Sequence, residues 1–211
     1  MPVTPFGPLT ITYDERVLTP REWTARQSEW AAELAGELPG GDVLELCSGA
    51  GHIGLLALAL IHGIDPHRRL VCVDLNPAAA ELTMANAAAA GLTVSVEMRC
   101  ADLAEAVASG ETFPLVIADP PWVLSADTGR FPDDPVLAID GGADGLDLAR
   151  ACLDVIGAHL APGGASVLQL GYAEQVGALA AALDANGLEV VEQRTEERGV
   201  LVRLARTAFV G

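Results

Sequence analysis

A short apolar strand meets a glycine-containing turn in Val43-Leu44-Glu45-Leu46-Cys47-Ser48-Gly49-Ala50-Gly51, and a helical pattern follows over residues 53–62. Glycine carries no Cβ and tolerates positive φ, so such a turn lets the backbone approach a ligand closely. A turn at the carboxyl end of a strand lies where open α/β sheets bind their ligands. The stretch therefore predicts a ligand site in an α/β domain.

Outward from this turn, short β-rich runs alternate with Ala- and Leu-rich helical stretches. We expect strands over residues 43–47, 70–74, 94–99, 115–119, 165–170, 188–194 and 200–206. The intervening pattern predicts helices over 53–62, 77–90, 103–109, 146–160 and 174–186. Alternation at this spacing is typical of right-handed crossovers and a largely parallel sheet.

The carboxyl-terminal end breaks this alternation. Only residues 195–199 separate the last two expected strands, which is too short for a parallel crossover and predicts an antiparallel hairpin. We therefore expect a Rossmann-like α/β fold with a seven-stranded, mostly parallel sheet closed by that hairpin.

A chain of 211 residues, 51% hydrophobic, suits a single globular domain. We expect residues 42–211 to form the main domain and residues 1–41 to be an N-terminal extension or lid. That extension carries an extended piece at 9–13 and a helix at 24–38. Residues 131–145, rich in acids, Pro and Gly, are expected to be a loop.

Charge and cysteine content narrow the function classes. The net charge is −17 and no lysine is present, which makes a nucleic-acid partner unfavourable because phosphates would be repelled on average. The four cysteines lack the paired spacing of zinc sites or disulfide frameworks, so we expect no metal site. With no long uncharged run, the sequence favours a cytoplasmic protein without a membrane partner; it does not indicate the oligomeric state.

The glycine turn admits two interpretations. Gly49, Gly51 and Gly54 fit G-x-G-x-x-G with Asp74 downstream, which is typical of a dinucleotide-dependent oxidoreductase. Glu45 argues against this, because a carboxylate ahead of the glycines would repel a pyrophosphate. It would attract the cationic methionyl part of S-adenosyl-L-methionine.

Two further acids follow strands on the same side of the expected sheet. Asp74 ends the second strand, where a carboxylate can accept both hydroxyls of a ribose; the alternative is that it caps the helix starting at Pro77, a role that Asn76 could also take. Asp102 and Leu103 follow the third strand and could flank an adenine. For Asp102, a capping role is equally compatible with the pattern.

The fourth expected strand leads directly into Asp119-Pro120-Pro121-Trp122. Two prolines remove amide donors and fix φ, which leaves carbonyls free to accept hydrogen bonds, and the tryptophan offers a flat stacking surface. Acceptance of N–H bonds by the Asp119 carboxylate and the Pro120 carbonyl would aim a nitrogen lone pair at a methyl group. The tetrapeptide therefore predicts methylation of nitrogen.

The turn, Asp74 and the tetrapeptide resemble those of class I amino-methyltransferases. Residues 141–147 with Arg150, and the segment Thr19-Pro20-Arg21-Glu22 with Thr24, resemble the release-factor glutamine methyltransferases of the HemK/PrmC type, and the likeness spans about 19–170. It implies S-adenosyl-L-methionine as cofactor, held by Glu45, Cys47, Gly49, Gly51, Asp74, Asp102 and Leu103. It also implies Asp119, Pro120 and Trp122 as catalytic residues, with Pro121 and Arg21 as substrate-binding residues.

This sequence departs from the family's pattern at three places. Cys47 stands for the usual first glycine, Asp119 and Trp122 stand for Asn and Tyr, and the family's N-terminal helical docking domain is missing from these residues. The prediction is an N-methyltransferase acting on a protein glutamine amide or a small-molecule amine or amide. A nucleic-acid adenine or guanine N-methyltransferase, the oxidoreductase and a catalytically silent binding module remain as alternatives.

Overall fold

The computed structural model describes residues 1–208 and contains the expected seven-stranded sheet, in the order β5-β4-β3-β6-β7-β9-β8. Its strands are β3 (Val43–Leu46), β4 (Leu70–Asp74), β5 (Val96–Cys100), β6 (Phe113–Ala118), β7 (Leu160–Leu170), β8 (Leu188–Thr195) and β9 (Val200–Arg206). Strands β3 to β7 pair in parallel, and β9 pairs antiparallel with both β7 and β8. The predicted fold class and the closing hairpin are confirmed.

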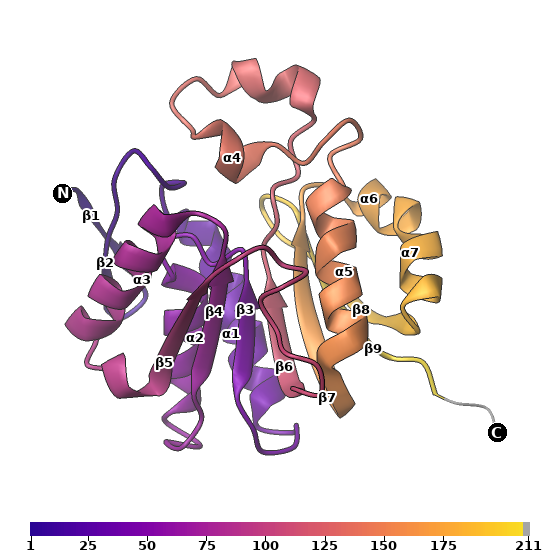
Figure 1. Ribbon diagram of the computed structural model, residues 1–211, viewed down its shortest axis with the longest axis horizontal. Coiled ribbons are helices and arrows are strands. Elements are labelled where there is room, and N and C mark those ends of the chain that lie inside the picture. The colour runs from indigo at the N-terminus through magenta and orange to yellow at the C-terminus, as the bar shows by residue number, and fades with distance from the viewer. Residues whose placement is uncertain (209–211) are drawn as a thin grey trace.

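Helices cover both faces of this sheet (Figure 1). Helices α1 (Ala25–Ala35), α2 (His52–Ile61) and α3 (Pro77–Ala89) share one aliphatic core with the sheet, and α5 (Asp147–His159), α6 (Ala173–Ala178) and α7 (Ala180–Ala185) share the other. Side chains alternate along each strand: Leu44 and Leu46 face the second core, whereas Val43 faces the first. Three layers result, with the loops after the parallel strands gathered along one edge.

The N-terminal residues pack on the α1–α3 side of the sheet. A hairpin of β1 (Val3–Phe6) and β2 (Leu9–Thr12) buries Phe6 and Ile11 in the core that also holds Trp30. The sequence pattern had indicated only the second of these strands. A short 3-10 helix, η1 (Glu22–Thr24), then leads into α1.

The helix expected over residues 103–109 is absent, and that prediction was wrong. Side chains take the place of helical hydrogen bonds there: Asp102 accepts the Ala104 amide (2.9 Å), Glu111 accepts the Ala108 amide (2.8 Å), and Arg99 donates to the Ala106 carbonyl (3.0 Å). Competition of this kind draws a polar segment away from a helix.

Other differences are smaller. The expected helix at 174–186 is divided into α6 and α7 at Leu179, and β7 begins at Leu160, five residues earlier than the pattern indicated. The expected loop at 131–145 contains one helical turn, α4 (Val136–Ile139), preceded by the 3-10 helix η3 (Ser125–Arg130); a third 3-10 helix, η2 (Thr93–Ser95), precedes β5. In the part of the chain described, no helix is long and apolar enough to cross a membrane.

Candidate active site

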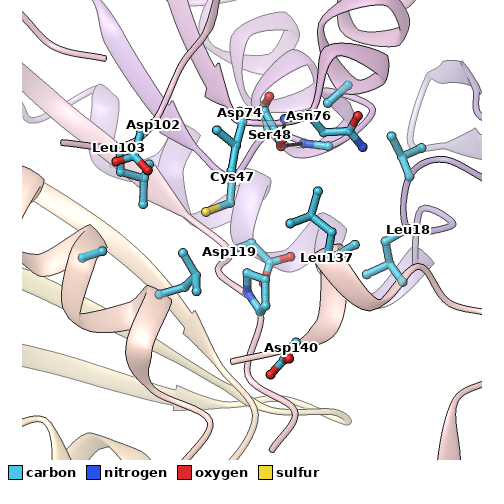
Figure 2. Close-up of a pocket in the computed structure, with 18 of the residues that line it drawn as sticks. Leu18, Cys47, Ser48, Asp74, Asn76, Asp102, Leu103, Asp119, Leu137 and Asp140 are labelled. Atoms are coloured by element: carbon cyan, nitrogen blue, oxygen red, sulfur yellow. Dashed lines mark hydrogen bonds between the residues drawn. The ribbon is translucent and has the colours of Figure 1, made fainter. Parts of the chain in front are cut away.

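Two cavities open at the carboxyl ends of the parallel strands. The first, here called the strand-end cavity, has a volume of about 640 Å³ and lies among the turns that follow β3, β4, β5 and β6 (Figure 2). Seven of the predicted site residues line it: Cys47, Gly49, Asp74, Asp102, Leu103, Asp119 and Pro121. Four strands therefore bring together residues that are far apart in the sequence.

The second, here called the aromatic cavity, has a volume of about 500 Å³. The predicted residues among its lining are Arg21, Asp119, Pro120, Pro121 and Trp122, joined by Trp23, Phe131 and Tyr172. Asp119 and Pro121 line both cavities, as do Leu18, His52 and Ala138. Among the predicted residues, Glu45 and Gly51 line neither.

The turn after β3 has an unusual backbone. Cys47 has φ of 59° and, among residues 1–208, is the one non-glycine residue in the left-handed region. Gly49 has φ of 54°, and a Cβ placed on it would meet no atom within 4 Å, so its backbone faces open space. At Gly51 a Cβ would lie 2.9 Å from the Thr83 side chain, which gives this glycine a packing role.

The Cys47 thiol is not set up as a nucleophile. The neighbouring Cys152 thiol and burial raise the pKa of Cys47 well above its ordinary value. A thiol held in its protonated form reacts slowly. Cys47 therefore acts here as an apolar wall of the strand-end cavity.

Asp74 supports the turn after β3 from the end of β4. Its Oδ2 accepts the Gly49 amide and its Oδ1 accepts the Asn76 amide, both at 2.8 Å. Helix α3 is capped by Asn76, whose Oδ1 accepts the Ala78 amide, so the capping interpretation weighed for Asp74 does not hold. Burial raises the pKa of Asp74, and its carboxylate lines the strand-end cavity.

Glu45 is buried beneath the turn and only 2% exposed. Its Oε1 accepts the Gly54 amide (2.7 Å), and the Cys72 thiol donates to Oε2 (3.2 Å). A Cβ on Gly54 would lie 2.3 Å from Oε2, so the third glycine of the G-x-G-x-x-G pattern makes room for a carboxylate of the protein itself. Gly54 therefore gives no support to the interpretation of this turn as a dinucleotide-binding pattern.

Burial raises the pKa of Glu45 to about 7, and the negative charges of Asp74 and Asp119 add to the effect. Carboxyl groups at the end of β4 and after β6 thus act on the carboxyl group of Glu45 in β3. A site of this kind favours a cation over an anion.

Asp102 and Leu103 lie on the opposite side of the strand-end cavity from Leu18 and Leu137 (Figure 2). One carboxylate oxygen of Asp102 accepts the amide of Ala104 and shapes the turn after β5. No helix begins there, so this bond forms a local turn and not the helix cap considered from the sequence.

Asp119 is the junction between the two cavities. Within the described part of the chain its carboxylate has no hydrogen-bond partner, and burial raises its pKa to about 7. The adjacent peptide is anchored by Gln27 of α1, whose Nε2 donates to the carbonyls of Ala118 (2.9 Å) and Val167 (3.0 Å). The carboxylate is therefore held on an anchored backbone at the boundary of the two cavities.

Three glycines pack closely around the tetrapeptide. A Cβ on Gly141 would lie 2.8 Å from the Pro121 carbonyl oxygen, and one on Gly145 would lie 2.6 Å from that of Trp122. On Gly171 it would lie 2.3 Å from the Trp122 ring. The 141–147 segment and the end of β7 thus fix the position of Trp122.

Arg21 lies at the aromatic cavity and pairs with Asp134, at 2.8 Å between Nη2 and Oδ1. This bond joins the segment before α1 to the segment before α4, which is why Arg21 reaches the site despite the distance in sequence. Its charge is balanced by Asp134.

Sequence reasoning missed several residues of the site. His52 follows the glycine turn directly and lines both cavities; burial lowers its pKa to about 4, and the Phe6 ring packs edge-on against it with centroids 4.9 Å apart. Its place after Gly51 was a usable signal. Gln27, Phe131 and Tyr172 gave none, because only the tertiary structure brings them to the tetrapeptide.

Among residues 1–208, no group of three or more His, Cys, Asp or Glu side chains is arranged to hold a metal ion.

The known proteins that are similar to this chain include methyltransferases. Residues 31–130 match the family described as "Methyltransferase small domain". A release factor glutamine methyltransferase of Cereibacter sphaeroides is 35% identical over 77% of this chain and 58% of its own length. A ribosomal protein uL3 glutamine methyltransferase of Bordetella pertussis is 30% identical over 75% of this chain and 54% of its own. The chain thus spans little more than half the length of these relatives.

Solved structures agree on the fold. A ribosomal protein L11 methylase of Lactobacillus delbrueckii superposes with a TM-score of 0.63 at 17% identity, covering 91% of this chain and 82% of that one. A human methyltransferase 10 domain containing protein gives 0.65 at 13% identity, covering 94% and 89%. This chain therefore has the fold of these methyltransferases, and over about three quarters of its length it is similar in sequence to a release factor glutamine methyltransferase.

Proposed function

We propose that the protein is an S-adenosyl-L-methionine-dependent N-methyltransferase that acts on a protein glutamine amide or on a small-molecule amine or amide. The observation that carries this proposal is the placement of Asp119. Within residues 1–208 its carboxylate has no partner, and it lies where a cavity suited to the cofactor meets a cavity suited to an acceptor.

The strand-end cavity fits this cofactor. The open face of Gly49 admits a ligand close to the backbone, and the Asp74 carboxylate at the end of β4 can accept the hydroxyls of a ribose. Leu103 and Asp102 would flank the adenine. The acidic surroundings set by Glu45, Asp74 and Asp119 suit a cationic ligand.

The cofactor would supply a methyl group activated by a positively charged sulfur. The role of this chain is to orient the acceptor nitrogen. Asp119 Oδ and the Pro120 carbonyl accept its N–H bonds, and the two prolines keep these acceptors rigid, so little reorganisation is needed as charge develops on nitrogen. Trp122 provides a flat wall for the group that carries the nitrogen.

Two acceptor chemistries are compatible with this arrangement. The relatives are named for glutamine methylation, which supports an amide. An amide loses its N–H proton only as the new bond forms, whereas an amine that arrives as an ammonium must first give a proton to a base. The Asp119 carboxylate can take that proton, whereas the Asn found at this position in the family cannot. The presence of Asp in place of Asn therefore supports an amine.

The test is transfer of a labelled methyl group from S-adenosyl-L-methionine to panels of amides and amines, with calorimetry for binding of the cofactor, S-adenosylhomocysteine and NAD. We expect S-adenosylhomocysteine to bind and NAD not to compete. Tight binding of NAD without any response to S-adenosylhomocysteine would overturn the proposal in favour of an oxidoreductase. Methyl transfer to nucleic-acid bases, with none to any amide or amine, would contradict the proposed class of acceptor.

A further inference from the structure

Half of the eight aromatic residues within residues 1–208 are gathered at one site. The chain has three Trp, two Tyr and four Phe residues, so its two cores are filled almost entirely by aliphatic side chains. Four of these nine, Trp23, Trp122, Phe131 and Tyr172, line the aromatic cavity. In contrast, Phe6, Trp30 and Phe113 are at most 3% exposed in the cores.

The four rings of the aromatic cavity are open to solvent. Phe131 is 40% and Tyr172 55% exposed, and Trp23 and Trp122 are partly exposed. They come from four separate segments: η1, the turn after β6, the residue after η3 and the start of α6. Apolar surface gathered at a concave opening by separate segments marks a recognition site, since folding gains nothing from leaving it in water.

Two of the rings form adjacent walls. The Trp122 and Tyr172 planes meet at 81° with centroids 5.6 Å apart. Gly171 makes this corner possible, because any Cβ there would enter the Trp122 ring. Aromatic faces attract cations through the ring quadrupole, with Trp the strongest, and a corner can present more than one ring to a single charge.

The charges of the aromatic cavity leave one carboxylate uncompensated. Arg21 pairs with Asp134. Glu197 and Arg198 are neighbours on the β8–β9 turn at the opening and contribute opposite charges. Within the described residues, Asp119 has neither an ion-pair nor a hydrogen-bond partner. The negative charge of Asp119 and the electron-rich aromatic rings both favour a positively charged ligand.

We propose that the aromatic cavity binds an organic ammonium ion, so that the acceptor of the reaction is a primary or secondary amine and not an amide. This inference rests on the proposed function, because it selects one of its two acceptor classes. In the reaction, the ammonium gives one proton to the Asp119 carboxylate. The freed lone pair then forms the N–C bond to the methyl group while the C–S bond breaks and its electron pair stays on sulfur.

The experiment measures binding on the protein without added cofactor, by quenching of tryptophan fluorescence from Trp23 and Trp122. Trp30, the third tryptophan, is buried and supplies a constant background. The probes are choline and its uncharged isostere with carbon in place of the quaternary nitrogen, which match in shape and differ in charge. We expect choline to bind at least about tenfold more tightly than the isostere.

Variants then locate the binding site. Tyr172→Leu keeps apolar volume but removes the ring, and it should weaken choline binding by about three- to fivefold while leaving the isostere unchanged. Tyr172→Phe retains the ring and should restore choline binding. Tyr13→Leu is the matched control, because Tyr13 is outside both cavities, and it should change nothing.

Equal affinity for the two probes, no binding of choline, or preference for propionamide over choline would each overturn the inference. So would choline binding that Tyr172→Leu leaves untouched. These outcomes are separate from failure of the proposed function, which would appear as absent cofactor binding or absent methyl transfer to every acceptor.

Discussion

The strand-end cavity and the aromatic cavity share Asp119 but are built in different ways. The strand-end cavity is formed by the turns that end neighbouring parallel strands, and its key contacts are short bonds such as the one between Asp74 and the Gly49 amide. The aromatic cavity is assembled from η1, the turn after β6, the residues that follow η3, the start of α6 and the β8–β9 turn. An ion pair and close glycine contacts hold these segments together. A ligand site that parallel strands create by topology therefore sits beside one that depends on how loops pack.

Because of this difference, we expect the two cavities to have different roles. The strand-end cavity follows from the fold, and open α/β sheets bind their ligands at this edge, so we expect it to hold the proposed cofactor. The aromatic cavity depends on loops, which vary more freely, so it should determine the acceptor. The predictions below separate the two.

The largest effect is expected at the junction. Asp119→Ala should lower the rate of methyl transfer by about 10²-fold or more, because the acceptor nitrogen loses the group that orients it. Cofactor affinity should change far less. Single-turnover rates and calorimetry on the same preparation measure both, and wild-type turnover by Asp119→Ala would remove Asp119 from catalysis.

The companion variant Asp119→Asn distinguishes the acceptor classes. If an amine must lose a proton to Asp119, Asn should fail nearly as badly as Ala. The wild-type rate should then rise with pH through about 7, where burial places the pKa of Asp119. Near-normal activity of Asp119→Asn with a flat pH profile would indicate an amide.

Asp74→Ala should weaken binding of S-adenosylhomocysteine by roughly 1.5–3 kcal/mol, since two charge-assisted hydrogen bonds to a ribose are lost. It should also reduce stability, because the Gly49 and Asn76 amides lose their acceptor. Calorimetry well below the melting temperature isolates the first effect. Unfolding without a specific loss of affinity would mean that Asp74 serves only the turn.

Gly171→Ala should damage the aromatic cavity alone. The new Cβ would displace the Trp122 ring, and methyl transfer should fall by about tenfold with cofactor affinity unchanged. Gly49→Ala is the counterpart in the strand-end cavity, where there is space but a positive φ, and it should weaken cofactor binding instead. If both variants impaired the same step, the two cavities would not be functionally distinct.

The smallest effect concerns stability against pH. Glu45 has a folded pKa of about 7, above its ordinary value of 4.5, so the folded state binds more protons between these values. Stability contributed by Glu45 is present below about pH 4.5 and is lost as pH rises through 7. Glu45→Gln should therefore be more stable than wild type at pH 8, by about 1–2 kcal/mol, and similar at pH 4. Chemical denaturation at both pH values measures this, and an equal difference at the two would contradict it.

Much of the strand-end cavity was predictable because its residues follow strands directly. Cys47, Asp74, Asp102 and Asp119 each end or follow a strand whose apolar pattern is plain, and parallel pairing brings such positions to one edge. Glu45 was expected at the cofactor but lies under the turn, because its strand position points it towards Gly54 and Cys72. Its contact with cofactor stays a prediction.

The helix predicted over residues 103–109 is also absent because of side-chain contacts that the local pattern does not reveal. Ala and Glu in that segment favour a helix locally, but Arg99, Asp102 and Glu111 offer its backbone other partners. Propensity is worth only fractions of a kcal/mol per residue, so a few side-chain bonds outweigh it.

By itself, the sequence determined the layered fold, the glycine turn, the acids that follow the strands and the tetrapeptide after β6, because these depend on periodicity and on neighbours in the chain. Only the tertiary structure decided what surrounds the acceptor. The aromatic cavity brings together Trp23, Trp122, Phe131 and Tyr172. Arg21 pairs with Asp134, which is 113 residues away in the sequence, and Gln27 anchors the peptide before Asp119. Contacts of that kind arise from the packing of loops and helices against the finished sheet, which leaves no periodic trace in the sequence.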